Sequence, residues 1–238
     1  MRRKTFLMML LATATLLLFG DVAMAAENDR SMFKLFVWPG GGPVSVLLIV
    51  VDVVSWAFIL QYVITVRRIN IMPEPVREQI RAMFDRKQYR EAIEFTASEP
   101  SMLSHIIHAS LNEAAHGYAS MERALDEAAE ARTAKLVRKI EVLNVLGNIG
   151  PMVGLLGTVL GIVMAFNDIV KMGGIPQPAY LADSIGVALV ATFWGLMVAI
   201  PALVVYALLR NRIEGLAAET ALTAEELISA FRPGLKKA

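Results

Sequence analysis

The hydrophobic positions of this chain are concentrated in three long runs, at 44–66, 142–169 and 184–209. Each run has the roughly 20 apolar residues that a helix needs to cross a bilayer. A polar segment, 67–141, separates the first run from the second, and a polar tail, 210–238, follows the third. The pattern predicts an all-α membrane protein with three spans and with long helices that extend into the cytoplasm.

The N-terminal segment 1–25 has the layout of a secretory signal peptide. Three basic residues at 2–4 precede an apolar stretch at 6–19, and a small-x-small cleavage sequence follows at 23–25. The apolar stretch is short for a membrane span. We therefore expect cleavage and a mature chain that starts with a periplasmic segment at 26–43. An uncleaved extra helix is the alternative.

Basic residues mark the span ends that face the cytoplasm by the positive-inside rule. They follow the first span, precede the second and follow the third, whereas the loop at 170–183 carries one cation, Lys171. This arrangement predicts a periplasmic N-terminus, a periplasmic loop at 170–183 and a cytoplasmic C-terminus. The basic residues that mark the cytoplasmic side are Arg67, Arg68, Lys135, Arg138, Lys139, Arg210 and Arg212.

The polar segment carries helix signals of its own. Residues 76–84 and 89–95 have the spacing of short amphipathic helices, and Ser120 is a candidate N-cap with Glu122 in the first turn. Apolar residues then recur at helical spacing without a helix breaker, which predicts one helix from about residue 120 into the second span. These residues are Leu125, Ala129, Leu136, Ile140 and Leu143.

The composition argues against several classes of function. The chain is 56% hydrophobic, and its net charge of +1 gives no basic surface for nucleic acid. The absence of cysteine removes disulfides, thiolate metal sites and cysteine nucleophiles. His105, His108 and His116 lie in one polar segment, but no carboxylate completes a metal site. Because enzyme motifs are also missing, we expect neither an enzyme, nor a cofactor, nor a metal centre.

The most informative motif lies in the second span, at 151–163. Pro151, Gly154, Gly157 and Gly161 occupy positions where a simple anchor would carry leucine, and Thr158 lies among them. Small residues let membrane helices approach closely, so this helix is expected to pack against others on several sides. The glycines do not form a phosphate loop, because no Lys-Ser or Lys-Thr follows.

Two faces place hydroxyl groups near the middle of the membrane. Asn144, Pro151, Thr158 and Ala165 are seven residues apart and form one stripe along the second span. In the third span, Thr192 shares a face with small residues. That face consists of Ile185, Ala188, Thr192, Gly195 and Ala199, and Pro201 is expected to belong to the helix packing as well.

Thr158 and Thr192 are predicted to lie within roughly 3–4 Å of one depth, from the 1.5 Å rise per residue. They are candidates for an ion pathway with Asn144. The alternative is that each threonine only bonds its own i−4 carbonyl. A hydroxyl relays protons but does not hold them, so a titrating group must come from another chain or from Asp52. Asp52 lies inside the first span and is either functional or turned into a protein interface.

The residues of the last two spans resemble the ExbB/TolQ/MotA proton-channel family, and the ExbB/TolQ branch more than the flagellar stators. The resemblance covers roughly residues 30–225 and rests on two motifs. The first is Pro151-Met-Val-Gly-Leu-Leu-Gly-Thr-Val-Leu-Gly-Ile162 with Phe166. The second is Ala188-Leu-Val-Ala-Thr192, then Gly195-Leu-Met-Val-Ala-Ile-Pro-Ala202 and Tyr206.

The resemblance implies an inner-membrane motor subunit. It implies a homo-oligomer, a pentamer, around a dimer of a single-span ExbD- or TolR-like partner that supplies an intramembrane aspartate. A TonB-like protein is a further implied partner, and the family's pore threonines fall on Thr158 and Thr192. One departure concerns Val187, which stands where ExbB and TolQ usually carry a glutamate. The valine makes the ion route less polar, and the conducted ion could be either H⁺ or Na⁺.

Three functional hypotheses follow. The first is a proton-driven subunit that couples the proton motive force to envelope or outer-membrane transport. The second is a flagellar- or gliding-stator-like motor subunit. The third is a non-conducting membrane scaffold, in which glycines and threonines serve packing alone.

Overall fold

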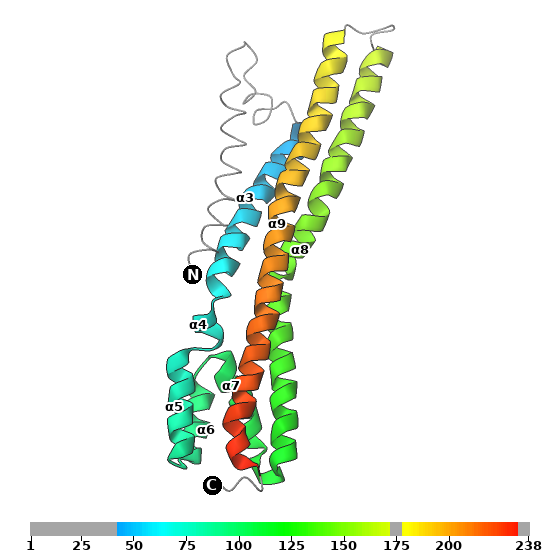
Figure 1. The fold of residues 1–238 in the computed structure, drawn as a ribbon. Coiled ribbons are helices and arrows are strands. Elements are labelled where there is room, and N and C mark those ends of the chain that lie inside the picture. The colour runs from blue at the N-terminus through cyan, green and yellow to red at the C-terminus, as the bar shows by residue number, and fades with distance from the viewer. Residues whose placement is uncertain (1–41, 172–177, 233–238) are drawn as a thin grey trace. The chain divides into compact units, whose positions relative to one another are not determined.

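The computed structural model describes residues 42–171 and 178–232, and every regular element in these two ranges is helical (Figure 1). This confirms the all-α prediction. The predicted signal peptide at 1–25 lies outside the described residues. The elements are α3 (Gly42–Thr65), α4 (Arg68–Ile71), α5 (Glu74–Asp85), α6 (Tyr89–Ser98), α7 (Met102–Asn112), η1 (Ala114–His116), α8 (Tyr118–Lys171), α9 (Pro178–Ile228) and η2 (Ser229–Phe231).

Three of these helices are long and apolar enough to cross a membrane by length and composition: α3, α8 and α9. α8 runs for 54 residues without interruption, as expected for a helix that continues from the polar segment into the second span. α9 runs for 51 residues, so the polar tail begins as a continuation of the third span's helix. The two short helices expected at 76–84 and 89–95 are α5 and α6.

The chain divides into two compact units. We call the first the membrane unit; its described residues are 42–55, 146–171 and 178–201. The second, called the charged unit because it holds most of the ionised side chains, consists of 56–145 and 202–232. α3, α8 and α9 each contribute to both units.

In the membrane unit, α8 and α9 touch backbone to backbone at glycines. A Cβ added to Gly154 would lie 3.1 Å from the Thr192 Cα, and one added to Gly150 would lie 2.8 Å from the Gly195 carbonyl oxygen. A Cβ added to Gly157 would collide with the Ala191 side chain and would lie 3.2 Å from a methyl group of Val44 on α3. Small residues are therefore required where these helices meet.

Two prolines lie inside these helices, Pro151 in α8 and Pro201 in α9. Proline lacks a backbone N–H, so each removes one i→i−4 hydrogen bond and frees one carbonyl. Both helices nevertheless continue past the proline. Membrane helices tolerate proline where neighbouring helices or side chains satisfy the freed group.

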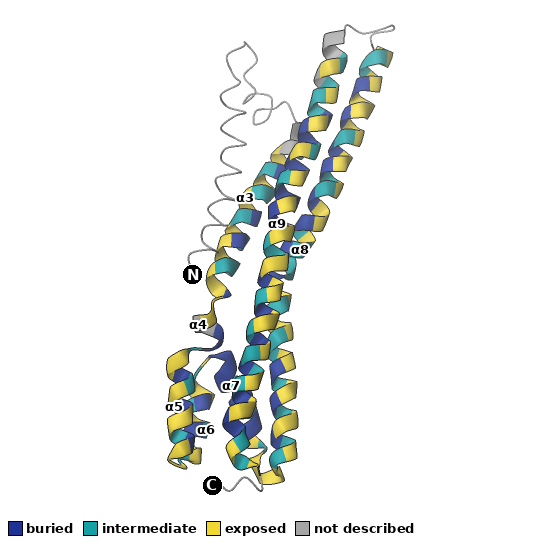
Figure 2. Cartoon of the chain, in the orientation of Figure 1, coloured by how far each residue is buried: buried dark blue, intermediate teal, exposed yellow. Residues whose placement is uncertain are grey.

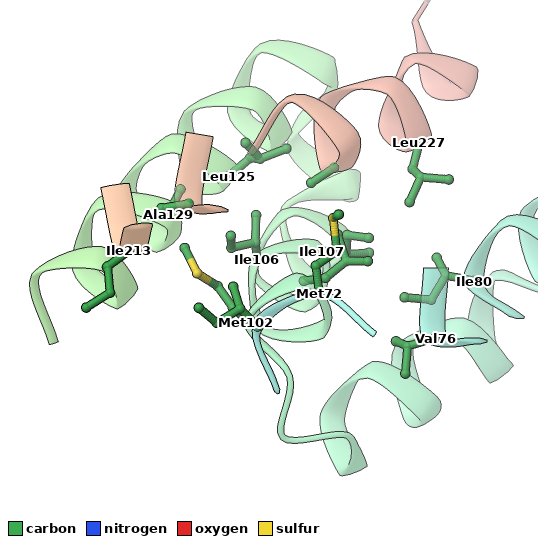
Figure 3. Close-up of a cluster of buried hydrophobic side chains, with 14 of the residues drawn as sticks. Met72, Val76, Ile80, Met102, Ile106, Ile107, Leu125, Ala129, Ile213 and Leu227 are labelled. Carbon is green, nitrogen blue, oxygen red and sulfur yellow. The ribbon is translucent and has the colours of Figure 1, made fainter. Parts of the chain in front are cut away.

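The charged unit has a core of large side chains drawn from all its helices (Figure 3). In α5, Val76, Ile80 and Phe84 are buried at four-residue spacing, so one face of this helix packs inward. Leu125, Ala129, Ile140 and Leu143 of α8 are also buried, and Leu136 packs against the same core. This is the apolar face that the sequence pattern predicts, and it anchors the first half of α8.

α7 of the charged unit is largely buried (Figure 2). Ser101 caps its N-terminus: its hydroxyl oxygen accepts a hydrogen bond from the Ser104 backbone N–H at 3.2 Å. A serine N-cap satisfies one of the four free N–H groups at a helix start.

The expectation that Ser120 caps the long helix is wrong. α8 begins two residues earlier, at Tyr118, directly after Gly117. Gly117 has a φ of 92°, a conformation that only glycine adopts without strain, so the turn into α8 is made there. Ser120 lies within the first turn instead, and its hydroxyl donates to the His116 carbonyl at 3.5 Å.

Candidate functional site

The two threonine hydroxyls of the membrane unit have different partners. The Thr192 hydroxyl of α9 donates to the Gly154 carbonyl of α8 at 3.4 Å, a bond between two helices. The Thr158 hydroxyl donates to the Leu155 carbonyl in its own helix at 2.6 Å. Thr158 therefore bonds a carbonyl of its own helix, at i−3 rather than at the i−4 position expected if the threonine served packing alone. Thr192 instead bonds the neighbouring helix.

The glycine contacts set the level of each threonine along the antiparallel pair α8 and α9. Gly161 faces Ala188, Gly157 faces Ala191, and Gly154 faces Thr192 and Gly195. Thr192 therefore lies opposite a position between Gly154 and Gly157, one to four residues before Thr158. At 1.5 Å per residue the two threonines are a few ångströms apart in level, roughly 2–6 Å.

The third candidate of the predicted pathway, Asn144, belongs to a different cluster in the charged unit. Its side-chain amide donates to Glu141 Oε1 at 2.7 Å. The other carboxylate oxygen, Oε2, accepts a hydrogen bond from the Tyr206 hydroxyl of α9 at 3.0 Å. Arg210 lies one turn beyond Tyr206; its NH1 reaches the Tyr206 hydroxyl oxygen at 3.5 Å, and its Nε donates to Glu214 at 2.9 Å. We call Glu141, Asn144, Tyr206 and Arg210 the Glu141 cluster.

The surroundings of Glu141 favour its ionised form. The hydrogen bond from Asn144 lowers the pKa of this carboxyl most, followed by the bond from Tyr206, and the Arg210 charge acts in the same direction. Partial desolvation opposes these effects but does not outweigh them. Hydrogen bonds to a carboxylate stabilise its charged form. Glu141 is thus a negative charge at the residue immediately before the expected second span.

Sequence reasoning missed Glu141 and Arg210 as site residues and quoted Tyr206 only as part of a motif. A signal was present, since Glu141 precedes Asn144 by three residues and Tyr206 precedes Arg210 by four, spacings that put each pair on one helix face. The contact of Glu141 with Tyr206 joins residues 65 positions apart. Nothing in the local sequence indicates that contact.

The intramembrane acid Asp52 lies on α3 within the membrane unit and is half-buried. Its Oδ1 atom and the hydroxyl of Ser55, one turn further along, are buried without a hydrogen-bond partner within the described ranges 42–171 and 178–232. Val187 is half-buried on α9.

The three histidines belong to the charged unit. His108 Nδ1 lies 3.3 Å from the Thr96 hydroxyl, and His116 Nδ1 lies 2.9 Å from a Glu113 carboxylate oxygen. In the part of the chain that the structure describes, no group of three or more histidine, cysteine or acidic side chains could hold a metal ion.

Taken together, the fold and these positions define a multi-pass helical membrane protein with glycine-packed spans. A family model described as the MotA/TolQ/ExbB proton channel family matches residues 98–221, which is more than half of the chain. The chain belongs to this family. The match covers α8 and most of α9, and with them the threonines and the Glu141 cluster.

Individual relatives are named as biopolymer transport proteins. The chain is 40% identical over 77 residues to ExbB of Helicobacter pylori, covering 32% of this chain and 52% of that protein. It is 43% identical over 63 residues to exbB1 of Vibrio cholerae, covering 26% and 28%. It is 31% identical over 153 residues to ExbB of Pseudomonas putida, covering 60% and 46%.

The chain thus spans about half the length, or less, of these curated relatives. Membership in a family of proton channels agrees with the expectation that the protein is not an enzyme. The three apolar helices also agree with the expectation of a multi-pass membrane protein.

Proposed function

We propose that this chain is the proton-channel subunit of an inner-membrane motor that couples the proton motive force to envelope or outer-membrane transport. The observation that carries the proposal is the hydroxyl pair Thr158 and Thr192, held at similar levels on two glycine-packed helices inside the family-matching region. The biopolymer transport names of the relatives support the transport role.

The proposed topology follows the basic residues. Arg67 and Arg68 after α3, and Arg210 and Arg212 near the end of the third apolar stretch, lie on the cytoplasmic side, and the segment between α8 and α9 lies in the periplasm. The charged unit is then mainly cytoplasmic. Its charged exterior and apolar core suit water on its outer surface.

The proposed conduction step needs a second protein. Thr158 and Thr192 pass hydrogen bonds along but cannot carry a proton at neutral pH. We propose that an ExbD- or TolR-like single-span partner brings an aspartate to their level, inside a homo-oligomer of this chain. Moving one proton through 100 mV releases about 2.3 kcal/mol, which biases a conformational change of the partner.

The experiment measures proton flux into proteoliposomes that contain the full chain with its co-purified single-span partner. Thr192→Val and Thr158→Val remove a hydroxyl with almost no change in volume, and we expect at least a tenfold loss of flux in the double variant. Thr→Ser at each site should stay close to wild type, because the hydroxyl remains. Thr133→Val is the matched control; Thr133 bonds only its own i−4 carbonyl, that of Ala129, in the charged unit.

A non-conducting scaffold is the second candidate, and the local bond of Thr158 to Leu155 favours it. In a scaffold the double valine variant keeps whatever permeability the wild-type complex has, while glycine substitutions still disrupt assembly. Full flux in the double variant would therefore refute the conduction proposal. If the complex instead assembles around a rotary motor as its stator, the protein is the stator-like subunit of the second hypothesis.

A further inference from the structure

The Glu141 cluster is a polar network that the proposed pathway leaves without a role. Both oxygens of the Glu141 carboxylate accept a hydrogen bond, one from Asn144 in the same helix and one from Tyr206 in the neighbouring helix. All the residues of this cluster belong to the charged unit. The cluster lies where the second apolar run begins and the third ends, that is, at an edge of the bilayer.

The cluster lies at the border of the apolar core of the charged unit. Ile140 and Leu143, next to Glu141 and Asn144, are fully buried, and Leu209 beside Arg210 is 4% exposed. Tyr206 is half-buried and packs against the same core. The Glu141 side chain is nevertheless only half-buried and Arg210 is exposed, so the carboxylate is held by its hydrogen bonds while it stays within reach of water.

We propose that Glu141 is the proton-transfer group at the cytoplasmic mouth of the channel, and that Asn144 and Tyr206 position its carboxylate. This inference rests on the proposed function. Water delivers the proton that has crossed the membrane, an O–H bond forms on the Glu141 carboxylate, and the same bond then breaks to return the proton to cytoplasmic water. The group is regenerated, so no other reactant is consumed.

The electrostatics of the cluster favour release of a proton from Glu141 over its retention. The hydrogen bonds from Asn144 and Tyr206, together with the charge of Arg210, lower the pKa of Glu141, so a captured proton leaves readily into near-neutral water. A group with a raised pKa would hold the proton and slow each passage. The negative charge at the mouth also attracts protons and other cations by simple Coulomb attraction.

Tyr206 offers a second element of the mechanism. Its hydroxyl donates to Glu141 and lies 3.5 Å from Arg210, so the guanidinium opposes protonation of the carboxylate beyond it. Arg210 is itself held by Glu214 at 2.9 Å. Tyr206 and Asn144 are thus positioning residues. Their removal should reduce the transfer rate less than removal of the carboxylate.

The test compares proton flux of the full chain with its co-purified single-span partner in proteoliposomes. Glu141→Gln keeps the size and hydrogen-bonding capacity of the side chain but cannot exchange a proton. We expect a tenfold or larger loss of flux with an unchanged melting temperature, in the range found for other positioned proton-transfer groups. Tyr206→Phe should lose less than Glu141→Gln. Glu130→Gln, an exposed acid on the same helix, should keep wild-type flux.

Chemical rescue separates proton transfer from a purely structural role. In Glu141→Ala, sodium formate on the side of the charged unit should restore several-fold of the lost flux, because formate supplies a carboxylate at the vacated position. Sodium chloride at equal concentration should not restore it. Formic acid itself carries protons across a bilayer, so rescue is the formate-dependent flux in excess of that of Glu141→Gln, whose amide leaves no vacated position. A structural defect would show no such excess.

The outcomes distinguish the two proposals. If the wild-type complex conducts, the threonine variants lose flux and Glu141→Gln conducts normally, the inference on Glu141 is wrong and the proposed function stands. If Glu141→Gln lowers both the flux and the melting temperature, and formate does not rescue Glu141→Ala, the cluster only stabilises the contact between α8 and α9. The inference is then also wrong. If the wild-type complex itself does not conduct, the proposed function fails first.

Discussion

The membrane unit and the charged unit pack by different rules although α3, α8 and α9 run through both. Among the described residues, the twelve largest fully buried side chains include eleven from the charged unit and one, Leu48, from the membrane unit. In that unit many large side chains are exposed instead; Met152 and Phe166, for example, are 68% and 65% exposed. Glycine, alanine and threonine lie at the closest contacts between α8 and α9. The buried apolar cluster of this unit is small and consists of Leu48, Val190 and Trp194.

The difference follows from the solvent. In water, removing apolar surface from the solvent is the main favourable term, so the charged unit buries isoleucine, leucine and methionine. In a bilayer the lipid is as apolar as leucine, and helices associate through close contact between small residues. One continuous helix such as α8 therefore packs differently in the two units, whose boundary on this helix lies between Val145 and Leu146.

The largest expected effect tests the core of the charged unit. Ile106 is fully buried in α7, and Ile106→Ala should cost about 2–5 kcal/mol of stability through lost burial and a cavity. Leu155→Ala, at a site 63% exposed in the membrane unit, should change stability by less than about 0.5 kcal/mol in detergent. Thermal unfolding followed by circular dichroism measures both. Equal losses would contradict the comparison between the units.

The next effect tests the glycine contacts of the membrane unit. A Cβ at Gly154 would meet the Ala191 carbonyl oxygen and the Thr192 Cα, each at 3.1 Å, and backbone atoms cannot yield as side chains do. We expect Gly154→Ala to cost about 1–3 kcal/mol by overpacking. Gly186→Ala on α9 is the control, because nothing lies within 4 Å of its added Cβ. If Gly186→Ala destabilises as much, close approach at Gly154 is not what matters.

A smaller effect tests the helix cap in the charged unit. Ser101→Ala removes the side-chain acceptor for the Ser104 N–H at the start of α7 and should cost about 1 kcal/mol. Ser120→Ala should cost less than about 0.5 kcal/mol, since Ser120 lies inside the first turn of α8 and caps nothing. Chemical denaturation curves would show the difference. A larger loss for Ser120→Ala would restore the cap that the sequence suggested.

The smallest effect is a dependence on pH. Burial lowers the pKa of His105, and the positive charges of Arg132, His108 and Lys135 lower it further. The unfolded chain therefore binds a proton more readily, and the folded chain loses stability as the pH falls below the ordinary histidine pKa of about 6.5. His105→Gln should flatten the decline in melting temperature between about pH 6.5 and 5. His116→Gln, on the exposed side of η1, should leave the decline in place.

Much of the architecture could be predicted from local patterns. The apolar runs predicted three long helices, and the spacing of Leu125, Ala129 and Ile140 predicted the buried face of α8. Such periodicity reflects which face of a helix meets water, and the local sequence carries that information in full. The first residue of α8 was harder to predict, because either Ser120 or Gly117 could precede the start of a helix. The backbone conformation of Gly117, with its positive φ, shows that the helix starts after this glycine.

The site shows the same division. The sequence by itself determined that one threonine hydroxyl lies among small residues on each of the second and third spans, and that the chain resembles a proton-channel family to which it does belong. Only the tertiary structure decided that Thr192 bonds across to Gly154 while Thr158 bonds within its own helix, and that Glu141 meets Tyr206. The physical reason is range: helical periodicity arises from neighbours three or four residues apart. A contact between α8 and α9 depends on the rotation and level of two helices, which only their packing sets.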